Sequence, residues 1–568
     1  MGIASARIGG LKPFDSLASL CVIGVAMFLA LPSPAMAAEP VTVTLWHSYR
    51  GAEEQALDQS LATFHESQSA IRIDALAIPN DVLASKLTTA LPRGHGPDIF
   101  VFAHERIGGW AKAGMLRPLD AHLAPGQLDG YLTETVEPLR YEGQLWGLPL
   151  SFKSLALFYN KALVPVPPKT SDEMVAVARA LSGNGRFGLA WETGNFYCHA
   201  PWFFGFGGKL FHEDGRLAFD SPGAIDSFAF VGGLRREGVL PEEVSGALVL
   251  SLFNQGNAGM VISGPWFTGD IAKEIDFGVA PLPIVSSTGK PATPFLTDEG
   301  VMVSALAKDP AAAFAAASFL AGDESARIRG TVGRQAVAAK SAWDDPALSG
   351  DPVLAAFREQ LATTTPMDNR PQMRNVWEPA QLALRKVLRG DATAEGAAIA
   401  GLRRFNAITR PTPPRSSPAA YLALGAAAAL GALALFVRSL SRTAKAGRVR
   451  EAAAGWAWVA PAAVATGVLI LVPFAVGLTL SLFDHREGTW TFVGLANFRD
   501  ILASRSFGPM EPLSFYYAFF VTVLWTAANL SLHVAFGLTL ALLLNRPTLR
   551  LKGIYRVLLI IPWARPRR

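Results

Sequence analysis

The feature that most constrains this chain is a set of three long apolar stretches in its last third. Residues 419–437, 456–483 and 515–544 contain no Asp, Glu, Lys or Arg. About 20 apolar residues in a helix are enough to cross the hydrocarbon core of a bilayer. The composition agrees, because 50% of the 568 residues are hydrophobic and only 17% are charged. We therefore predict that the chain ends in an all-α transmembrane region with three spans.

The charges that flank these stretches predict their orientation. Residues 438–450 contain basic residues and no acid, and further basic residues follow the third stretch (Arg546, Arg550, Lys552 and Arg556). The connection between the second and third stretches instead carries acids (Asp484, Glu487, Asp500 and Glu511). Lys- and Arg-rich loops stay on the cytoplasmic side of a membrane. We expect residues 438–450 inside the cell and the part of the chain before residue 419 outside.

The first 37 residues have the pattern of an export signal. Arg7 and Lys12 precede an apolar run, LASLCVIGVAMFLAL, and Ala35 and Ala37 follow it at the spacing of a cleavage site. The alternative is an uncleaved membrane anchor. Both interpretations predict a multi-pass protein of the inner (plasma) membrane with its globular part in the periplasm or outside. With only two cysteines, the chain has no disulfide framework.

Residues 41–410 have the alternating patterns of an α/β protein. VTVTLW (41–46), IRIDALAI and DIFVFA are typical of strands, and Leu57, Leu61 and Phe64 between the first two recur on one helical face. Alternating strands and helices indicate βαβ units with a parallel sheet. About 370 residues exceed one ordinary domain, so two lobes are expected. The proline-rich segment 411–418 is expected to be an extended linker.

Four blocks of this part resemble, in the same order, those of the maltose/maltodextrin-binding protein family, the periplasmic sugar-binding proteins of ABC importers. The blocks are GPDIFVFAHERIGGWAKAGML, RYEGQLWGLPLSFKSLALFYNKALVPVPPKT, FNQGNAGMVISGPW and PQMRNVW. The resemblance implies the type II periplasmic-binding-protein fold, in which two α/β lobes close on an oligosaccharide.

The resemblance also implies which residues contact the ligand. Sugars offer C–H faces to aromatic rings and hydroxyls to charged or amide groups. Phe102 would provide a stacking face at a strand end, with Glu105 and Arg106 as hydroxyl partners, whereas Trp46, Trp110 and Trp146 are expected to be packing residues. The complete set of expected ligand-binding residues is Arg50, Phe102, Glu105, Arg106, Lys153, Asn195, Tyr197, Trp266, Met367 and Trp377.

Three positions depart from the family pattern. Lys153 and Asn195 stand where the family has acids, and Gln381 replaces an arginine. An ammonium group only donates hydrogen bonds, whereas a carboxylate only accepts them. Lys153 therefore predicts a disaccharide other than maltose, or an acidic sugar.

Residues 450–564 resemble the opening spans of sugar ABC permeases of the maltose-system type. FVGLANFRDIL and AFGLTLALLLNRPTLRLKGIYRVLLIIPWA carry this resemblance, which covers only the first part of such a domain. It does not include the EAA…G loop through which these permeases hold their ATPase. We therefore expect a receptor fused to a truncated permease, with a second permease subunit, a separate cytoplasmic ATPase, membrane lipid and an oligosaccharide as partners.

Two other functions are open, a membrane-anchored glycosidase and a sugar-sensing receptor. A glycosidase needs two carboxyl groups, and only Glu105 has the support of a motif. Its neighbour Arg106 is expected to keep Glu105 ionised rather than poised as an acid. No nucleotide-binding loop, metal-ligand spacing or basic stripe interleaved with aromatics occurs in the sequence. We expect no enzyme activity, no catalytic residue, no cofactor, no metal and no nucleic acid.

Overall fold

The structure is a computed structural model that describes residues 39–241, 244–445, 449–486, 489–504, 507–512, 514–546, 553–555 and 557. The predicted signal peptide, residues 1–37, lies outside the described residues. The chain divides into two compact units, and each is described by itself. Unit 1 consists of Met1–Glu192, Ala200–Trp202 and Val239–Met373, and unit 2 of Thr193–His199, Phe203–Gly238 and Arg374–Arg568.

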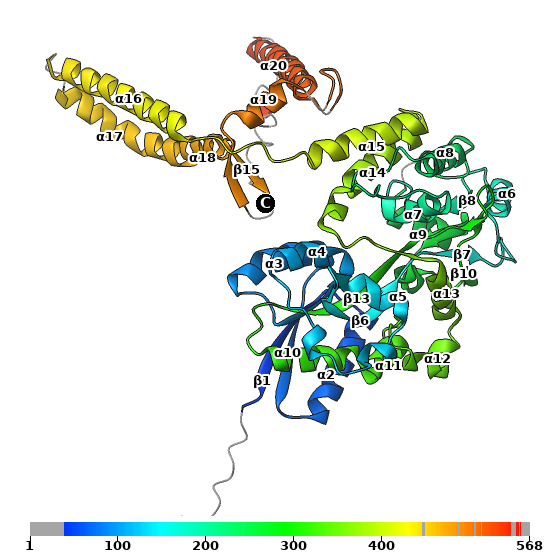
Figure 1. Cartoon of the computed structure of the whole chain (residues 1–568). Helices are drawn as coiled ribbons and strands as arrows, with labels where there is room; N and C mark the ends of the chain where they lie inside the picture. Colours follow the sequence, from blue (N-terminus) through cyan, green and yellow to red (C-terminus); the bar gives the residue numbers. More distant parts are fainter. Residues whose placement is uncertain are drawn as a thin grey trace, which may run out of the picture. The chain divides into compact units, whose positions relative to one another are not determined.

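The first lobe of unit 1 is built on a six-stranded sheet with the order β14-β13-β3-β1-β2, in which β6 also pairs with β13 (Figure 1). Its strands are β1 (Val41–His47), β2 (Ile71–Ala77), β3 (Ile99–Ala103), β6 (Gly147–Lys153), β13 (Phe295–Val303) and β14 (Thr365–Pro366).

The predicted parallel sheet is confirmed for β1, β2 and β3 and incomplete beyond them. β1 pairs in parallel with both β2 and β3, as βαβ connections require. β13 is antiparallel to β3 and to β6, which makes the sheet mixed. The cause is non-local, since β13 enters the sheet nearly 200 residues after β3. Period-2 patterns do not predict such a pairing.

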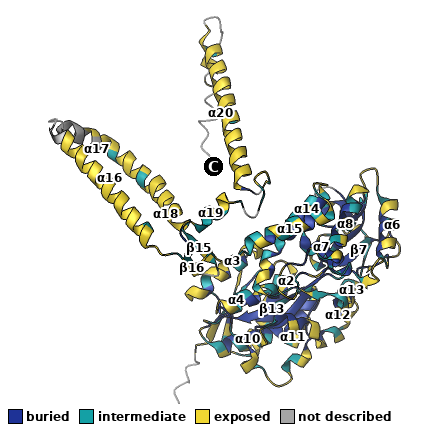
Figure 2. Cartoon of the chain, turned by 45° about the horizontal axis from the view of Figure 1, so that its top comes forward, coloured by how far each residue is buried: buried dark blue, intermediate teal, exposed yellow. Residues whose placement is uncertain are grey.

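Helices cover this sheet with the faces that the apolar pattern predicts. α2 (Ala52–Ser67) buries Leu57, Leu61 and Phe64, and Phe64 packs on Phe319 of α10 (Pro310–Ala321) at 4.8 Å between ring centroids. Figure 2 shows the buried sheet between helices with exposed outer faces. The remaining helices of this lobe are α3 (Asn80–Ala90), α4 (Ile107–Lys112), α5 (Thr133–Val136), α10 (Pro310–Ala321) and α11 (Asp323–Thr331).

The second lobe of unit 1 has a four-stranded sheet with the order β10-β7-β9-β8. Its strands are β7 (Ala156–Asn160), β8 (Phe187–Ala190), β9 (Ala258–Ser263) and β10 (Phe277–Ala280). Its helices include α6 (Ser171–Leu181), α9 (Gly246–Asn254) and α13 (Pro352–Gln360). Thr170 and Glu173 form a capping box that fixes where α6 begins. Two separate sheets confirm the prediction of two α/β lobes.

The globular part of unit 2 is a close packing of α8 (Pro222–Arg236), α14 (Trp377–Leu388) and α15 (Ala394–Ile408). Two glycines permit the approach of these helices. A Cβ atom on Gly232 of α8 would lie 2.5 Å from Val387 of α14, and one on Gly401 of α15 would lie 3.1 Å from the Pro379 carbonyl oxygen of α14. Larger residues at either position would push the helices apart.

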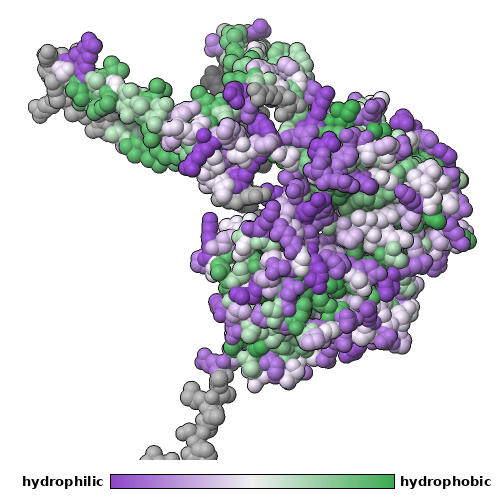
Figure 3. All heavy atoms as spheres, viewed as in Figure 1, coloured by the Kyte–Doolittle hydropathy of each residue, from purple (hydrophilic) through white to green (hydrophobic). Residues whose placement is uncertain are grey.

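Among the residues that the structure describes, the C-terminal part of unit 2 contains three helices long and apolar enough to cross a membrane, Ala419–Arg442, Trp458–Leu480 and Phe515–Asn545. They lie within α16 (Ala419–Lys445), the consecutive α17 (Val449–Thr466) and α18 (Val472–Leu480), and α20 (Phe515–Asn545). Figure 3 shows apolar side chains along these helices. A π-helical turn, Gly467–Leu471, separates α17 from α18 directly before Pro473. Proline cannot donate to a carbonyl one turn earlier, so the helix widens there.

A small module follows α18. It contains a hairpin of β15 (Phe483–Arg486) and β16 (Thr489–Phe492), followed by α19 (Ala496–Leu502). The linker contacts this module, because the Ser416 amide donates to the Phe492 carbonyl at 2.9 Å. Arg410, directly before the linker, forms an ion pair with Asp500 of α19 at 3.1 Å.

Candidate ligand-binding site

Four neighbouring strands bring polar and aromatic side chains to one edge of the six-stranded sheet. Tyr49 follows the end of β1, Phe102 lies near the end of β3, and Lys153 ends β6. β13 runs in the opposite direction and brings Glu299 to the same edge, where its backbone pairs with Ala103 and Ser151. In sheets of this class, the carboxyl ends of the parallel strands are the usual place for ligands.

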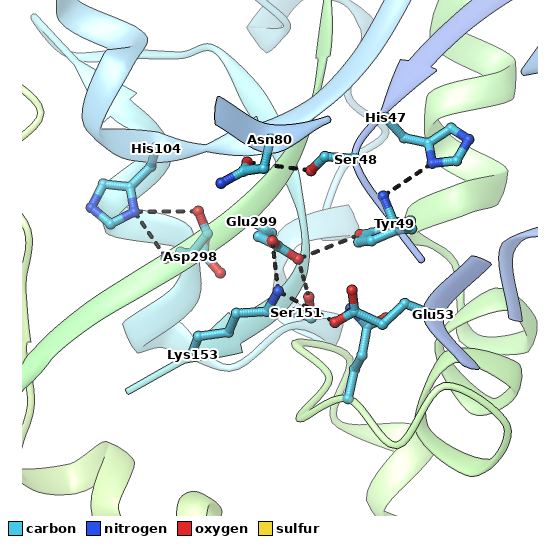
Figure 4. A network of polar contacts seen from close by, with 11 residues as sticks. His47, Ser48, Tyr49, Glu53, Asn80, His104, Ser151, Lys153, Asp298 and Glu299 are labelled. Carbon is cyan, nitrogen blue, oxygen red and sulfur yellow. Dashed lines mark hydrogen bonds and ion pairs between the residues drawn. The ribbon is translucent and has the colours of Figure 1, made fainter. Parts of the chain in front are cut away.

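Glu299 is the centre of a hydrogen-bonded network at this edge (Figure 4). Its Oε1 accepts from the Lys153 Nζ at 2.9 Å, and its Oε2 accepts from the Ser151 hydroxyl at 3.1 Å and, at the longer distance of 3.5 Å, from the Tyr49 hydroxyl. Lys153 also forms an ion pair with Glu53 of α2 at 3.3 Å. The side chains of Lys153, Glu299 and Glu53 are 23%, 15% and 32% exposed, so the network is open to solvent on one side.

The two carboxylates fix the charge of the lysine. Burial alone would lower the pKa of Lys153, but Glu299 and Glu53 outweigh burial and raise that pKa. Burial, and then the negative charge of Glu299, raise the pKa of Tyr49. Lys153 is therefore a permanent cation held by two acids, and Tyr49 is a neutral hydroxyl donor.

The environment of Glu105 favours its ionised form less than the expected pairing with Arg106 implies. The two side chains are 3.7 Å apart, and that of Glu105 is 20% exposed. Burial raises the pKa of Glu105 to about 7, with a smaller upward contribution from Glu299, and the guanidinium of Arg106 offsets only part of the burial effect. The Oε2 atom of Glu105 is buried and has no hydrogen-bond partner among the residues that the structure describes. Burial therefore opposes the ionised form that Arg106 is expected to maintain, because the desolvation of Glu105 exceeds the attraction of a half-exposed arginine.

His104, directly after β3, forms hydrogen bonds with the backbone of two other segments near this edge. Its Nδ1 accepts from the Asp298 amide at 2.9 Å, which leaves Nε2 to donate to the Met367 carbonyl at 2.8 Å. Burial lowers the pKa of His104 to about 4, so the ring is neutral. The histidine thereby joins β3, β13 and the segment after β14 on one side of the network.

The other expected residues of unit 1 lie in different environments. Phe102 packs edge-on against the buried Trp110 at 5.2 Å between ring centroids, and Met367 is buried. Arg50 is exposed, and Trp266 is 49% exposed on a short 3₁₀ helix, Pro265–Asp270. Trp266 therefore presents an indole face without being part of the core.

Three expected residues belong to unit 2. The Asn195 side chain accepts from the Tyr197 amide at 3.0 Å, at the start of α7 (Phe196–Gly205). Trp377 is the first residue of α14, and its ring lies 6.4 Å from that of Phe196, edge to face. These residues form a local cluster within unit 2.

Three residues of the network were not predicted from the sequence: Glu53, Glu299 and Tyr49. One signal for Glu299 was available, since the pair Asp298–Glu299 interrupts the apolar strand FLTDEGVMV. Neighbouring residues of a strand face opposite sides of the sheet, so one of the two acids had to face away from the other. The packing roles expected for Trp110 and Trp146 are confirmed, because both are buried and donate hydrogen bonds through their indole nitrogens.

Comparisons with known proteins give one consistent result. The family described as bacterial extracellular solute-binding protein matches residues 50–327. A maltotriose-binding protein of Pyrococcus abyssi is 30% identical over 369 residues, which cover 63% of this chain and 80% of that protein. A galactooligosaccharide-binding protein of Bacillus subtilis is 27% identical over 354 residues, which cover 60% of this chain and 83% of that protein.

Solved structures that are similar to this chain belong to the same class of protein. The crystal structure of a cyclo/maltodextrin-binding protein complexed with maltotetraose matches with a TM-score of 0.61 and 28% identity, covering 66% of this chain and 99% of that one. The match includes nearly all of that protein, and it leaves about a third of this chain without a counterpart there.

Proposed function

Because the chain belongs to the family of bacterial extracellular solute-binding proteins, we propose that it binds an oligosaccharide outside the cytoplasmic membrane for import by an ABC-type transporter. Maltotriose, galactooligosaccharide and maltotetraose are the ligands named for the similar proteins. They share a chain of neutral rings rich in hydroxyl groups, and we infer a ligand of that class.

The observation that carries this proposal is the half-open network around Glu299. Carboxylates, an ammonium group and hydroxyls at one sheet edge can exchange hydrogen bonds with many sugar hydroxyls. We propose that Phe102 and Trp266 offer ring faces to the sugar, with Glu105, Arg106, Arg50 and Met367 as further contacts. Asn195, Tyr197 and Trp377 complete the proposed set.

The three apolar helices support a fused architecture. We propose that they hold the receptor at the membrane as a multi-pass protein, and that residues 450–564 are part of a permease domain. A second permease subunit and a separate ATPase chain would then complete the importer. A short tether replaces diffusional encounter by an effective concentration that can reach about the millimolar range.

Ligand-induced stabilisation of the full chain in lipid nanodiscs tests the proposal. A ligand that binds only the folded state raises the melting temperature as its concentration exceeds Kd. Maltotriose, maltotetraose and a galactooligosaccharide should each be tested, together with non-saccharide solutes as controls. We expect at least one oligosaccharide to stabilise the protein, and Trp266→Ala to weaken binding about tenfold or more without changing the melting temperature of the free protein. Failure of all oligosaccharides would contradict the proposal.

One observation favours a second candidate, a glycosidase. Glu105 has a pKa raised to about 7, as a general acid requires, and Glu299 lies close enough to affect it. Against this function, Glu299 accepts hydrogen bonds from Lys153, Ser151 and Tyr49, which lower its reactivity as a nucleophile. An assay for the release of reducing ends from an oligosaccharide distinguishes hydrolysis from binding. Turnover that Glu105→Gln abolishes would replace binding as the function.

A further inference from the structure

The contacts of Lys153 in the structure differ from those of a free ammonium group at a sugar site. A free ammonium group at a sugar site would attract an acidic ligand, because it donates hydrogen bonds and carries a positive charge. In this chain the Nζ atom already contacts Glu299 Oε1 at 2.9 Å and Glu53 Oε1 at 3.3 Å. One N–H group therefore donates a hydrogen bond to Glu299, and the charge of the ammonium group is also paired with Glu53.

The formal charges of Glu53, Lys153 and Glu299 sum to one negative charge. Glu53 and Glu299 carry two negative charges against one positive charge on Lys153, and all three side chains are partly buried. Gln335 donates to the Oε1 of Glu53 at 3.1 Å, the same oxygen that Lys153 contacts. Glu53 Oε2 has no hydrogen-bond partner among the described residues and remains an acceptor on a side chain that is 32% exposed.

We propose, on the basis of the proposed function, that Glu53, Lys153 and Glu299 form an acceptor cluster that selects neutral oligosaccharides and rejects sugars carrying a carboxylate. Lys153 then holds the two acids in position and does not recruit an anion. A uronate next to this cluster would meet two carboxylates at short range, in a partly buried place where charges are weakly screened. Neutral hydroxyls can instead donate to the carboxylate oxygens.

A matched pair of ligands tests this selectivity. Isothermal titration of the full chain in nanodiscs would compare maltotriose, and separately a galactooligosaccharide, with the same sugar oxidised at one C6 to a uronate. We expect a neutral sugar to bind at least about tenfold more tightly than its oxidised form. Glu53→Gln should narrow that ratio several-fold, and Glu53→Gln combined with Glu299→Gln should reverse it, because Lys153 then becomes an unbalanced cation.

Glu54→Gln is the control for charge, since it lies in the same turn of α2 and makes no hydrogen bond or ion pair among the described residues. The ratio of its affinities for the neutral and the oxidised sugar should equal that of the natural protein. The Glu53→Gln variant also covers the case in which Glu299→Gln fails to fold, because Glu53 is the more exposed of the two acids. An unchanged ratio in Glu53→Gln would overturn the inference.

Two further outcomes separate this inference from the proposed function. Tighter binding of a uronate than of its neutral form by the natural protein would overturn the selectivity and leave oligosaccharide binding intact. Binding of neither form by a protein that melts cooperatively would count against both.

Discussion

Two neighbouring acids of β13 show how strongly position decides the chemistry of a residue. Glu299 faces the solvent edge and is balanced by Lys153. Asp298 faces inward, is fully buried, and neither of its carboxyl oxygens has a hydrogen-bond partner among the described residues. Burial raises the pKa of Asp298 well above its ordinary value, with a smaller contribution from Glu299. Both effects favour the uncharged form of the Asp298 carboxyl group.

Glu105 predicts a pH dependence of sugar binding. Its pKa in the free protein is about 7, and sugar hydroxyls donate better to the ionised carboxylate. Binding must then release a proton below pH 7, so affinity should rise from pH 6 to pH 8, by at most about tenfold per pH unit. Titration calorimetry at pH 6, 7 and 8 measures this change. Glu105→Gln should bind more weakly at pH 8 and show a flat profile, whereas a flat profile in the natural protein would contradict the assignment.

His104 predicts a pH dependence of stability with the same sign. The unfolded chain binds this proton with a pKa of 6.5, and the folded protein only below about 4. Between these values the unfolded state binds more protons, so the free energy of unfolding falls as pH falls from about 6.5 to 4. His104→Asn removes this dependence and should cost about 1–2 kcal/mol at pH 7, because it leaves the Met367 carbonyl unpaired.

The measurement for His104 is a comparison of melting temperatures at pH 7, 5.5 and 4.5. The difference between the natural protein and His104→Asn should shrink as pH falls. Contributions from Glu105 and Asp298 are common to both proteins and cancel. The exposed His95 provides the control, since His95→Asn should have little effect at any of these pH values. A constant difference for His104→Asn would argue that its role is packing alone.

At the scale of elements, the sequence predicts what is local and misses what is not. The strand patterns of β1, β2 and β3 and the buried face of α2 were predictable, because alternation and helical periodicity report burial within a few residues. The site depends on β13, which joins β3 and β6 across long sequence separations. Pairing of this kind is decided by tertiary packing, so neither Glu299 nor its partners could be placed next to Lys153 from periodicity.

The linker, residues 411–418, is a second example of a segment whose local structure is predictable and whose non-local contacts are not. Its prolines predict an extended segment, and the structure adds contacts to the module after α18. Ser416 donates to the Phe492 carbonyl at 2.9 Å, and Arg410 pairs with the largely buried Asp500 at 3.1 Å. Asp500→Asn should weaken this attachment. We therefore expect trypsin to cut after Arg415 several-fold faster in Asp500→Asn than in the natural protein.

Limited proteolysis of the full chain in nanodiscs, followed by mass spectrometry of the fragments, measures that rate. Asp214→Asn is the matched control, because it removes one acid from an exposed ion pair with Arg216 in another part of unit 2. Equal cleavage rates in the two variants would show that the contacts of the linker contribute nothing to its protection.

For the molecule as a whole, the open question is how a receptor fold and three apolar helices act in one chain. The similarity to solute-binding proteins accounts for about two thirds of the residues. The remaining third is the part for which the sequence predicts spans, with basic residues in 438–450 and acids between the second and third spans. Helix length and hydropathy permit membrane crossing, and the distribution of charge predicts its direction.

Labelling of single cysteines tests this topology. In a background with Cys21 and Cys198 replaced by serine, Ala503→Cys lies after the second span. Ser441→Cys lies in the basic segment 438–450, which follows the first predicted span, residues 419–437. A membrane-impermeant maleimide should label Ala503→Cys in cells with an intact cytoplasmic membrane, and Ser441→Cys only after that membrane is opened. Labelling of Ser441→Cys in intact cells would invert the topology and place the sugar-binding lobes inside. Because both positions are exposed, a difference in labelling must come from the membrane and not from burial within the protein.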